Sequence, residues 1–283
     1  MQSSAENGAN AELLVATRFV AARRAAAALP GFPGALPPNL EFGYRCQDCA
    51  ITLWPDRVAG WKVGLIAEDR REPGGDGRLV GPIFAKAVRI AHDGVLDVPV
   101  FVGGFAAVEA EYVFRLGADA PAGKTDWSIA EAAALADALH VGVELAGSPL
   151  ATINELGPAV VVSDFGNNAG LILGAAIDDW RQRDAAELVC SVAVAGREVG
   201  RGGAASIAGG PLAALAFALS RNARRGRPLR AGDLVTTGAA TGIHDIVAGQ
   251  TALIEFGAHG RIACRAVPAA ADGAMSDDTG VAC

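Results

Sequence analysis

The sequence contains no uninterrupted apolar run of the ~20 residues that a membrane-spanning helix needs. This holds although hydrophobic residues make up 51% of the chain and the mean hydropathy is +0.30. Charged residues interrupt each apolar stretch, as Glu144 does within 141–145. Three arginines do the same near the N-terminus, which argues against a secretory signal there. We therefore expect a cytoplasmic protein with no membrane partner.

The chain also lacks a run of basic residues. Its formal net charge is -7, its pI is about 5.1, and it has four histidines. Such a chain is poorly suited to binding a phosphate backbone, so we expect no nucleic-acid partner. A site for a small acidic metabolite remains open, because a bound divalent ion can supply positive charge locally.

Cysteine is scarce and odd in number, with five in 283 residues. This excludes a disulfide framework. Cys46 and Cys49 form a C-x-x-C pattern, but no second pair and no histidine pair follows at zinc spacing. A redox pair would also require a preceding strand, which the proline-rich segment 30–38 does not offer. We expect two half-buried cysteines on successive turns of a helix.

Charged residues make up only 19% of the chain, which is typical of a folded protein with a substantial core. Apolar spacing predicts helices over 11–29, 42–54, 128–139 and 211–224. It predicts strands over 58–66, 98–102, 106–116, 140–145, 160–162, 171–177, 189–194, 234–237 and 251–256. Because these do not alternate regularly, we expect an α+β fold with a β-rich centre. The predicted division is a helical region (1–57), a catalytic core (58–267) and a disordered tail (268–283), with 1–10 frayed.

Three carboxylates suggest a metal site. In 107–116, AVEAEYVFRL, the alternation predicts a strand that carries Glu109 and Glu111 on one face, ~7 Å apart. Glu144 lies in the otherwise apolar run 140–145, with no Lys or Arg nearby in the sequence. A hard cation such as Mg²⁺ or Mn²⁺ would replace repulsion between these groups by coordination. For the E-x-E pair alone, a solvated strand face is the alternative.

Two further segments could bind an acidic substrate or act on it. Lys62 lies between two glycines in the apolar run GWKVGL, where an amine could transfer protons or anchor an anion. The alternative is an edge-strand lysine that reaches solvent. In 231–244, Thr236, Thr237 and Gly238 offer hydroxyls and amides that could hold a carboxylate. An ordinary glycine-rich hairpin would have a similar sequence.

The order of these segments resembles the 2-keto-4-pentenoate hydratase family of the fumarylacetoacetate hydrolase superfamily. The resemblance extends from about residue 44 to 256 and is carried by GWKVGL, GPIF, VEAEYVFRL, VELAGSP, SDFGNNAGLILG, GGPLAALAFAL and GDLVTTG. It implies a β-rich mixed sheet or roll with flanking helices. It also implies a homo-oligomer that hydrates a short 2-keto or 2-hydroxydienoic acid from aromatic meta-cleavage.

The resemblance also implies roles for individual residues. Glu109, Glu111 and Glu144 would bind Mg²⁺ or Mn²⁺, and Lys62 would be catalytic. Thr237, Gly238 and Asp164 are assigned to substrate binding. Leu79, Gly147 and Pro149 depart from the family pattern, since many hydratases have acidic residues near the first two and an arginine near the third.

These departures leave three alternatives open. The first is a decarboxylase of a 2-oxo-dioic acid of the 4-oxalocrotonate type, which could use the same metal site. The second is a C–C bond hydrolase, although no Glu–His dyad is evident. The third is a non-catalytic subunit that stabilises a partner enzyme.

Overall fold

The computed structural model describes residues 2–272, in which the strands form two sheets. The larger sheet has the order β2 (Arg78–Phe84), β1 (Val58–Leu65), β10 (Leu234–Thr236), β5 (Phe105–Leu116), β6 (Ala136–Ser148), β7 (Asn168–Ala176), β3 (Val88–Ile90), and β11 (His244–Asp245) pairs with β5. The smaller has the order β4 (Val95–Val100), β13 (Arg261–Pro268), β12 (Thr251–Glu255), β8 (Val189–Val194), β9 (Arg197–Gly203). Both contain parallel and antiparallel pairs.

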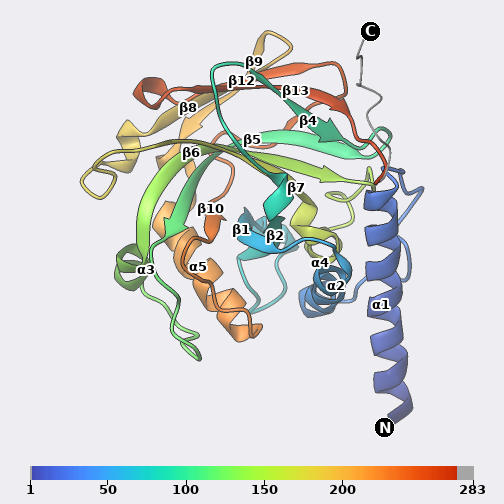
Figure 1. Cartoon of the computed structure of the whole chain (residues 1–283). Coiled ribbons are helices and arrows are strands. Elements are labelled where there is room, and N and C mark those ends of the chain that lie inside the picture. Colours follow the sequence, from blue (N-terminus) through green and yellow to red (C-terminus); the bar gives the residue numbers. More distant parts are fainter. Residues whose placement is uncertain (1, 273–283) are drawn as a thin grey trace, which may run out of the picture.

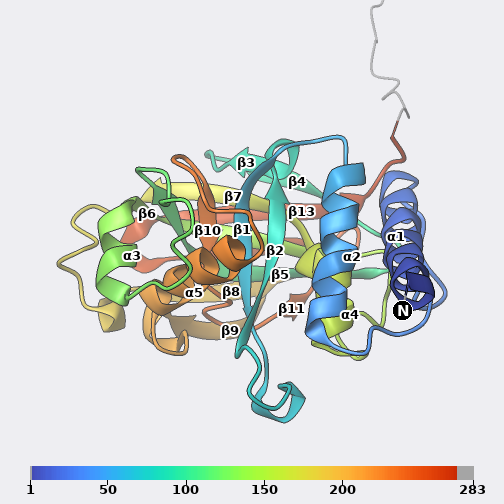
Figure 2. The ribbon, with the colours of Figure 1, turned by 90° about the horizontal axis from the view of Figure 1, so that it is seen from below.

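Helices flank this β-rich centre. They are α1 (Gln2–Arg24), α2 (Leu40–Leu53), α3 (Ile129–Leu135), α4 (Pro158–Ser163) and α5 (Pro211–Arg224). The smaller sheet covers one side of the larger one, and α2, α4 and α5 lie on the other side (Figure 1). The view from below shows these helices in front of the sheet, with α1 at its edge (Figure 2). The α+β class with a mixed central sheet is confirmed.

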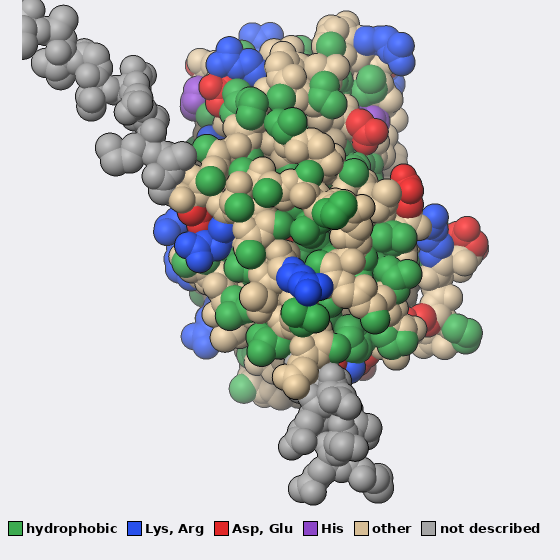
Figure 3. Space-filling model, turned by 90° about the vertical axis from the view of Figure 1, so that its right-hand side faces the viewer, with side chains coloured by type: hydrophobic (Ala, Val, Ile, Leu, Met, Phe, Trp, Pro, Cys, Tyr) green, Lys and Arg blue, Asp and Glu red, His purple; other side chains and the backbone are tan. Residues whose placement is uncertain are grey.

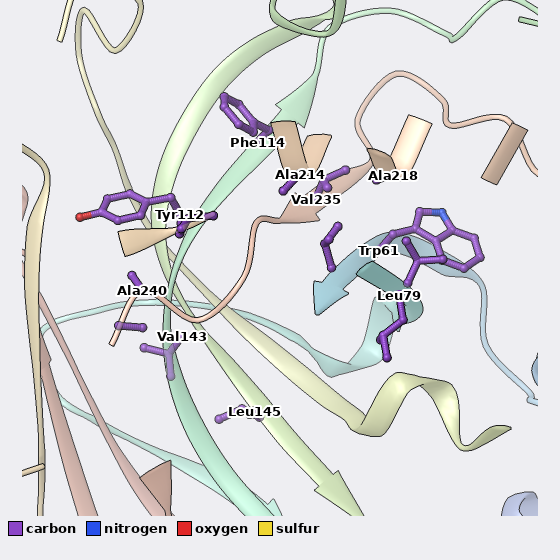
Figure 4. Packing of buried hydrophobic residues seen from close by; sticks show 14 of the residues in the cluster. Trp61, Leu79, Tyr112, Phe114, Val143, Leu145, Ala214, Ala218, Val235 and Ala240 are labelled. Carbon is purple, nitrogen blue, oxygen red and sulfur yellow. The ribbon is translucent and has the colours of Figure 1, made fainter. Parts of the chain in front are cut away.

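Strand β5 is buried on both faces, which positions the candidate site. Tyr112 points toward the smaller sheet, where its ring meets Phe256 edge to face at a centroid distance of 6.0 Å. The odd-numbered residues of β5, including Val113, point to the other face, where Val113 packs with Leu171 and Leu234. Figure 4 shows the neighbouring apolar packing, in which side chains of α5 lie beside Val235 of β10. The predicted alternation of this segment is therefore correct, but neither face is solvated.

Several predicted elements differ from the structure. The segment 160–162, predicted as a strand, lies in α4, which begins with Pro158 at a position suited to a helix start. The helix predicted over 128–139 ends at Leu135, and β6 takes over from Ala136 because pairing with β5 overrides the helix propensity of this alanine-rich stretch. Strands β9 and β13 were not expected.

The ends of the chain differ from expectation in part. Helix α1 begins at Gln2, so the segment expected to be frayed is helical, in keeping with its alanines and glutamate. Of the tail predicted to be disordered, 273–283 lies outside the described residues, and Pro268 still belongs to β13. The division at residue 57 stays a prediction.

Three further features concern membrane helices, the cysteine pair and the surface around α1. No helix within 2–272 is long and apolar enough to cross a membrane. Cys46 and Cys49 are free thiols on successive turns of α2; Cys49 is half-buried, as expected, whereas Cys46 is fully buried, and burial raises its pKa to about 12. The face that carries α1 displays many hydrophobic side chains (Figure 3), and α1 itself exposes Leu13 and Leu14.

Candidate metal and substrate site

The three predicted carboxylates converge on one point inside the molecule. Glu109 and Glu111 lie on β5, and the register of β5 with β6 places Glu144 directly opposite Glu109. Their side chains are buried, with exposed fractions of 4%, 0% and 0% in chain order. One oxygen of each lies within 4.8 Å of the others. A long antiparallel pair thus joins residues that are 33 or more positions apart in sequence.

This convergence is unfavourable without a cation. Burial, and to a smaller extent the neighbouring Glu144, raise the pKa of Glu109 to about 7. Burial, followed by Glu144 and Glu109, raises the pKa of Glu111 well above its usual range. Oε1 of Glu109 and Oε1 of Glu111 are buried and accept no hydrogen bond from the described residues. Two orphaned carboxylate oxygens in an all-oxygen cluster fit a hard divalent ion such as Mg²⁺ or Mn²⁺.

Lys62 completes the charge pattern of this cluster. It lies on β1, between β2 and β10, and is 5% exposed, so it is not an edge-strand lysine that reaches solvent. Its Nζ lies 3.2 Å from Oε1 of Glu144 and donates a hydrogen bond to Oδ1 of Asn167 at 3.3 Å. Burial alone would lower its pKa, but Glu144, Glu109 and Glu111 raise it overall. The ammonium form therefore persists beside the carboxylates.

The loop after β10 holds the carboxylates in place. The backbone N–H groups of Thr237 and Gly238 donate to Oε2 of Glu111 at 2.9 and 2.8 Å. The hydroxyl of Thr236 donates to Oε2 of Glu144 at 3.0 Å. The hydroxyls and amides that were expected to hold a substrate carboxylate thus bind the protein's own carboxylates. Thr237 and Gly238 also line the adjoining cavity.

A left-handed turn presents Asn167 to Lys62. Phe165, Gly166 and Asn167 have φ of 55°, 64° and 54°, a conformation that costs free energy for the two residues with side chains. Gly81 of β2, which is paired with Lys62, makes room for this turn. A Cβ at Gly81 would lie 2.1 Å from the backbone oxygen of Phe165.

Replacing Gly81 by alanine should therefore destabilise the protein. The new Cβ would clash with a backbone oxygen, which no side-chain movement can displace. We therefore expect a loss of about 1–3 kcal/mol in the free energy of unfolding. Urea denaturation measures this loss. Gly31→Ala is the matched control, because a Cβ there meets nothing within 4 Å. Equal unfolding free energies for the two variants would contradict the close approach.

A cavity of about 330 Å³ opens beside the cluster. Lys62, Glu109, Thr237 and Gly238 line its inner end, and the lining also includes Leu79, Val161, Asn167 and Ile207. Leu79, Val161 and Ile207 make part of its wall apolar. The cavity is large enough for a small organic acid.

Asp164 does not line this cavity, and its assignment to substrate binding stays a prediction. Its carboxylate is buried and accepts hydrogen bonds from Nε and Nη2 of Arg23 on α1, at 2.5 and 2.9 Å, and from the hydroxyl of Ser148 at 2.6 Å. These partners satisfy the carboxylate and tie α1 to the sheet. Gly147 and Pro149 also lie away from the cavity lining, and the carbonyl of Gly147 accepts a hydrogen bond from Arg23.

Five residues of the site were not identified from the sequence. Asn168 donates to Glu144, and Asn167 connects Lys62 to Asn154, whose Oδ1 accepts a hydrogen bond at 3.0 Å. The paired asparagines in SDFGNNAG were a signal that could have been used. Arg70 and Arg78 line the outer part of the cavity and had no comparable sequence signal.

No protein-family model matches the chain, whereas comparison with curated proteins and with solved structures gives several matches. Over 186 residues the chain is 31% identical to a protein named 2-keto-4-pentenoate hydratase from Burkholderia vietnamiensis, a match that covers 65% of this chain and 68% of the relative.

Two solved proteins share the fold. One is 4-oxalocrotonate decarboxylase from Pseudomonas putida G7, complexed with calcium and acetate (TM-score 0.75, 19% identity, 91% of this chain and 98% of the other). A second structure of that enzyme, complexed with magnesium and adipate, also has a TM-score of 0.75, with 19% identity and coverage of 90% and 97%. Fumarylpyruvate hydrolase from Pseudomonas aeruginosa, in complex with Mn²⁺ and pyruvate, has a TM-score of 0.55, 20% identity and coverage of 76% and 91%.

Proposed function

Because the chain belongs to the 2-keto-4-pentenoate hydratase family, we propose that it is a metal-dependent hydratase that adds water to a 2-hydroxydienoate or 2-keto-alkenoate. The observation that carries this proposal is the buried cluster of Glu109, Glu111 and Glu144 beside Lys62 at the inner end of a cavity. Such acids arise from meta-cleavage of aromatic rings, which the family resemblance suggests as the metabolic context. The product would be a 4-hydroxy-2-keto acid.

Mg²⁺ or Mn²⁺ would be held by Glu109, Glu111 and Glu144. When bound, such an ion supplies a Lewis acid that polarises the oxygens of a 2-keto acid. Magnesium, manganese and calcium are present in the solved structures that share this fold, which supports a divalent cofactor.

The protein's own groups have separable tasks in the proposed reaction. In this reaction the protonated amine of Lys62 would give a proton to the substrate carbon skeleton and take one back, and its contacts with Glu144 and Asn167 support this role because they fix its position. Thr237 and Gly238 keep the Glu111 carboxylate oriented. Leu79 and Ile207 give the substrate chain an apolar wall that limits bulk water.

We predict that Mg²⁺ raises the melting temperature more at about pH 8 than at about pH 5.5. The pKa of Glu109 is raised from 4.5 to about 7, so between these values the folded, metal-free protein binds more protons than the unfolded chain. Its stability therefore falls as the pH rises through this window. Metal binding requires the ionised carboxylates and becomes stronger over the same window. Thermal unfolding with MgCl₂, or with NaCl at equal ionic strength, measures the difference; an effect independent of pH would contradict the prediction.

Decarboxylation of a 2-oxo-dioic acid is the second candidate, and the arginines of the outer cavity favour a substrate of that charge. Incubation with Mg²⁺ and 2-hydroxypenta-2,4-dienoate tests the hydratase: loss of dienol absorbance with ¹⁸O from water in the product supports it. Release of CO₂ from 4-oxalocrotonate supports the second candidate instead. Inactivity with both acids, in protein that binds the metal, would contradict both.

Two properties of the molecule stay predictions. We propose a homo-oligomer, which three things support: the superfamily resemblance, the exposed Leu13 and Leu14 of α1, and the many hydrophobic side chains on the face that carries α1 (Figure 3). We also propose a cytoplasmic location, in keeping with a catabolic enzyme that acts on small acids. Light scattering after gel filtration measures the subunit number.

A further inference from the structure

The outer part of the cavity is lined by two arginines that the proposed hydration does not use. Arg70 ends the turn after β1, and Arg78 begins β2, so both belong to the loop that connects these strands and extends from the sheet (Figure 2). Both line the same cavity as Lys62 and Glu109. Glu109 is the only acidic residue in that lining.

Each guanidinium is held by carbonyl groups of the opposite wall. Nη1 of Arg70 donates to the carbonyls of Asn154 and Glu155 at 2.7 and 3.3 Å, and Nη2 of Arg78 donates to the carbonyl of Ala208. A guanidinium has five N–H groups, so several donors on each remain available. Neither forms an ion pair with any carboxylate among the side chains that the structure describes.

Three of the four acidic residues of the same loop contact other groups, and the fourth, Asp69, is exposed and does not line the cavity. Glu72 accepts a hydrogen bond from the backbone N–H of Leu40 at the start of α2. Asp76 lies 3.6 Å from Arg221 and from Arg224 of α5. Glu68 lies 3.8 Å from Arg71. Arg70 and Arg78 therefore line the cavity, whereas none of the loop's acidic residues does.

We infer that Arg78, assisted by Arg70, binds a second carboxylate at the far end of the substrate, so that the natural substrate is a dioic acid. This inference rests on the proposed function, which places the 2-keto acid end beside Glu109 and Lys62. Three carboxylates, one ammonium and a divalent ion together carry no net charge, whereas the two arginines add two positive charges. A dianion neutralises the site, and a monoanion does not.

The spacing agrees with such a substrate. In the register of β1 with β2, Lys62 pairs with Gly81 and Leu65 pairs with Arg78. Three residues of strand separate these backbone positions by about 10 Å, a length of the same order as an extended acid of six or seven carbons with a hydrogen bond at each end, and both side chains line the one cavity. Arg78 is half-buried, so its contact with a carboxylate is less screened than one at the open surface.

Matched inhibitors test this inference. With Mg²⁺-loaded protein, calorimetry should show that 2-oxoadipate binds at least about 10-fold more tightly than 2-oxohexanoate, which has the same length and lacks the second carboxylate. Arg78→Met should bring the two affinities within about threefold, by weakening 2-oxoadipate alone, and Arg70→Met should have a smaller effect of the same kind. Arg78→Lys, which keeps the charge, should retain part of the preference. Arg201→Met, at an exposed position on β9, is the control and should change neither affinity.

The outcomes separate the two proposals. Equal affinity of the native protein for both acids would overturn the dioic-acid inference and leave the proposed function intact. A preference that survives in Arg78→Met and in Arg70→Met, with native-like circular dichroism, would also overturn it. Failure of both acids to bind the metal-loaded protein would contradict the proposed function itself, and the inference with it.

Discussion

Replacing Glu144 by glutamine is expected to weaken Mn²⁺ and Mg²⁺ binding by on the order of 100-fold or more. Glu144 lies opposite Glu109 across the strand pair and is the carboxylate that also contacts Lys62. Glutamine keeps the shape of the side chain and an oxygen that can accept from Asn168 or Thr236, so the fold should be retained. The loss would therefore report the charge and the ligand atom. Calorimetry, or Mn²⁺ electron paramagnetic resonance, measures the affinity.

Glu198→Gln is the matched control for this experiment. Glu198 lies on the exposed strand β9, paired with Arg201, and its replacement should leave metal affinity within about twofold. Glu109→Ala should weaken metal binding at least as strongly as Glu144→Gln, because each removes one of three converging ligand oxygens. Native-like affinity in both variants would show that the ion binds elsewhere, and the assignment of the site would be withdrawn.

Part of this site could be predicted from the sequence because strand periodicity is local. The two-residue repeat of 107–116 places Glu109 and Glu111 on one face of the strand, independently of its tertiary contacts. The apolar surroundings of Glu144 and Lys62 likewise predicted buried charges that need a partner. What periodicity could not supply was the register between strands, which alone brings Glu144 opposite Glu109.

The errors have the same origin in long-range contacts. The contact of Asp164 with Arg23 joins residues 141 positions apart, and from the sequence Arg23 was interpreted only as an interruption of an apolar pattern. The stretch from Ala136 has a helical composition, and only its pairing with β5 makes it a strand. The left-handed turn at Phe165 is stabilised by the space at Gly81, on a strand 84 positions away.

Replacing Lys62 by methionine should separate catalysis from metal binding. Methionine fills a similar volume but cannot transfer a proton, so we expect turnover to fall by about 10²–10⁴-fold. Because the three carboxylates remain, affinity for Mn²⁺ should stay within about threefold, the opposite pattern to Glu144→Gln. Exchange of substrate carbon-bound hydrogen with deuterated solvent should fall together with turnover, since the same amine is proposed to carry the proton.

A purely structural role for Lys62 would give a different result. If the lysine served only to offset the charge of Glu144, Lys62→Arg would restore activity, and metal-loaded Lys62→Met would remain active because the ion neutralises the cluster. Lys86→Met is the control, since Lys86 lies outside the cavity lining and its loss should leave turnover unchanged. Full activity of Lys62→Met would exclude Lys62 from proton transfer, whereas an inactive Lys62→Arg that still binds Mn²⁺ would show that positive charge alone is insufficient.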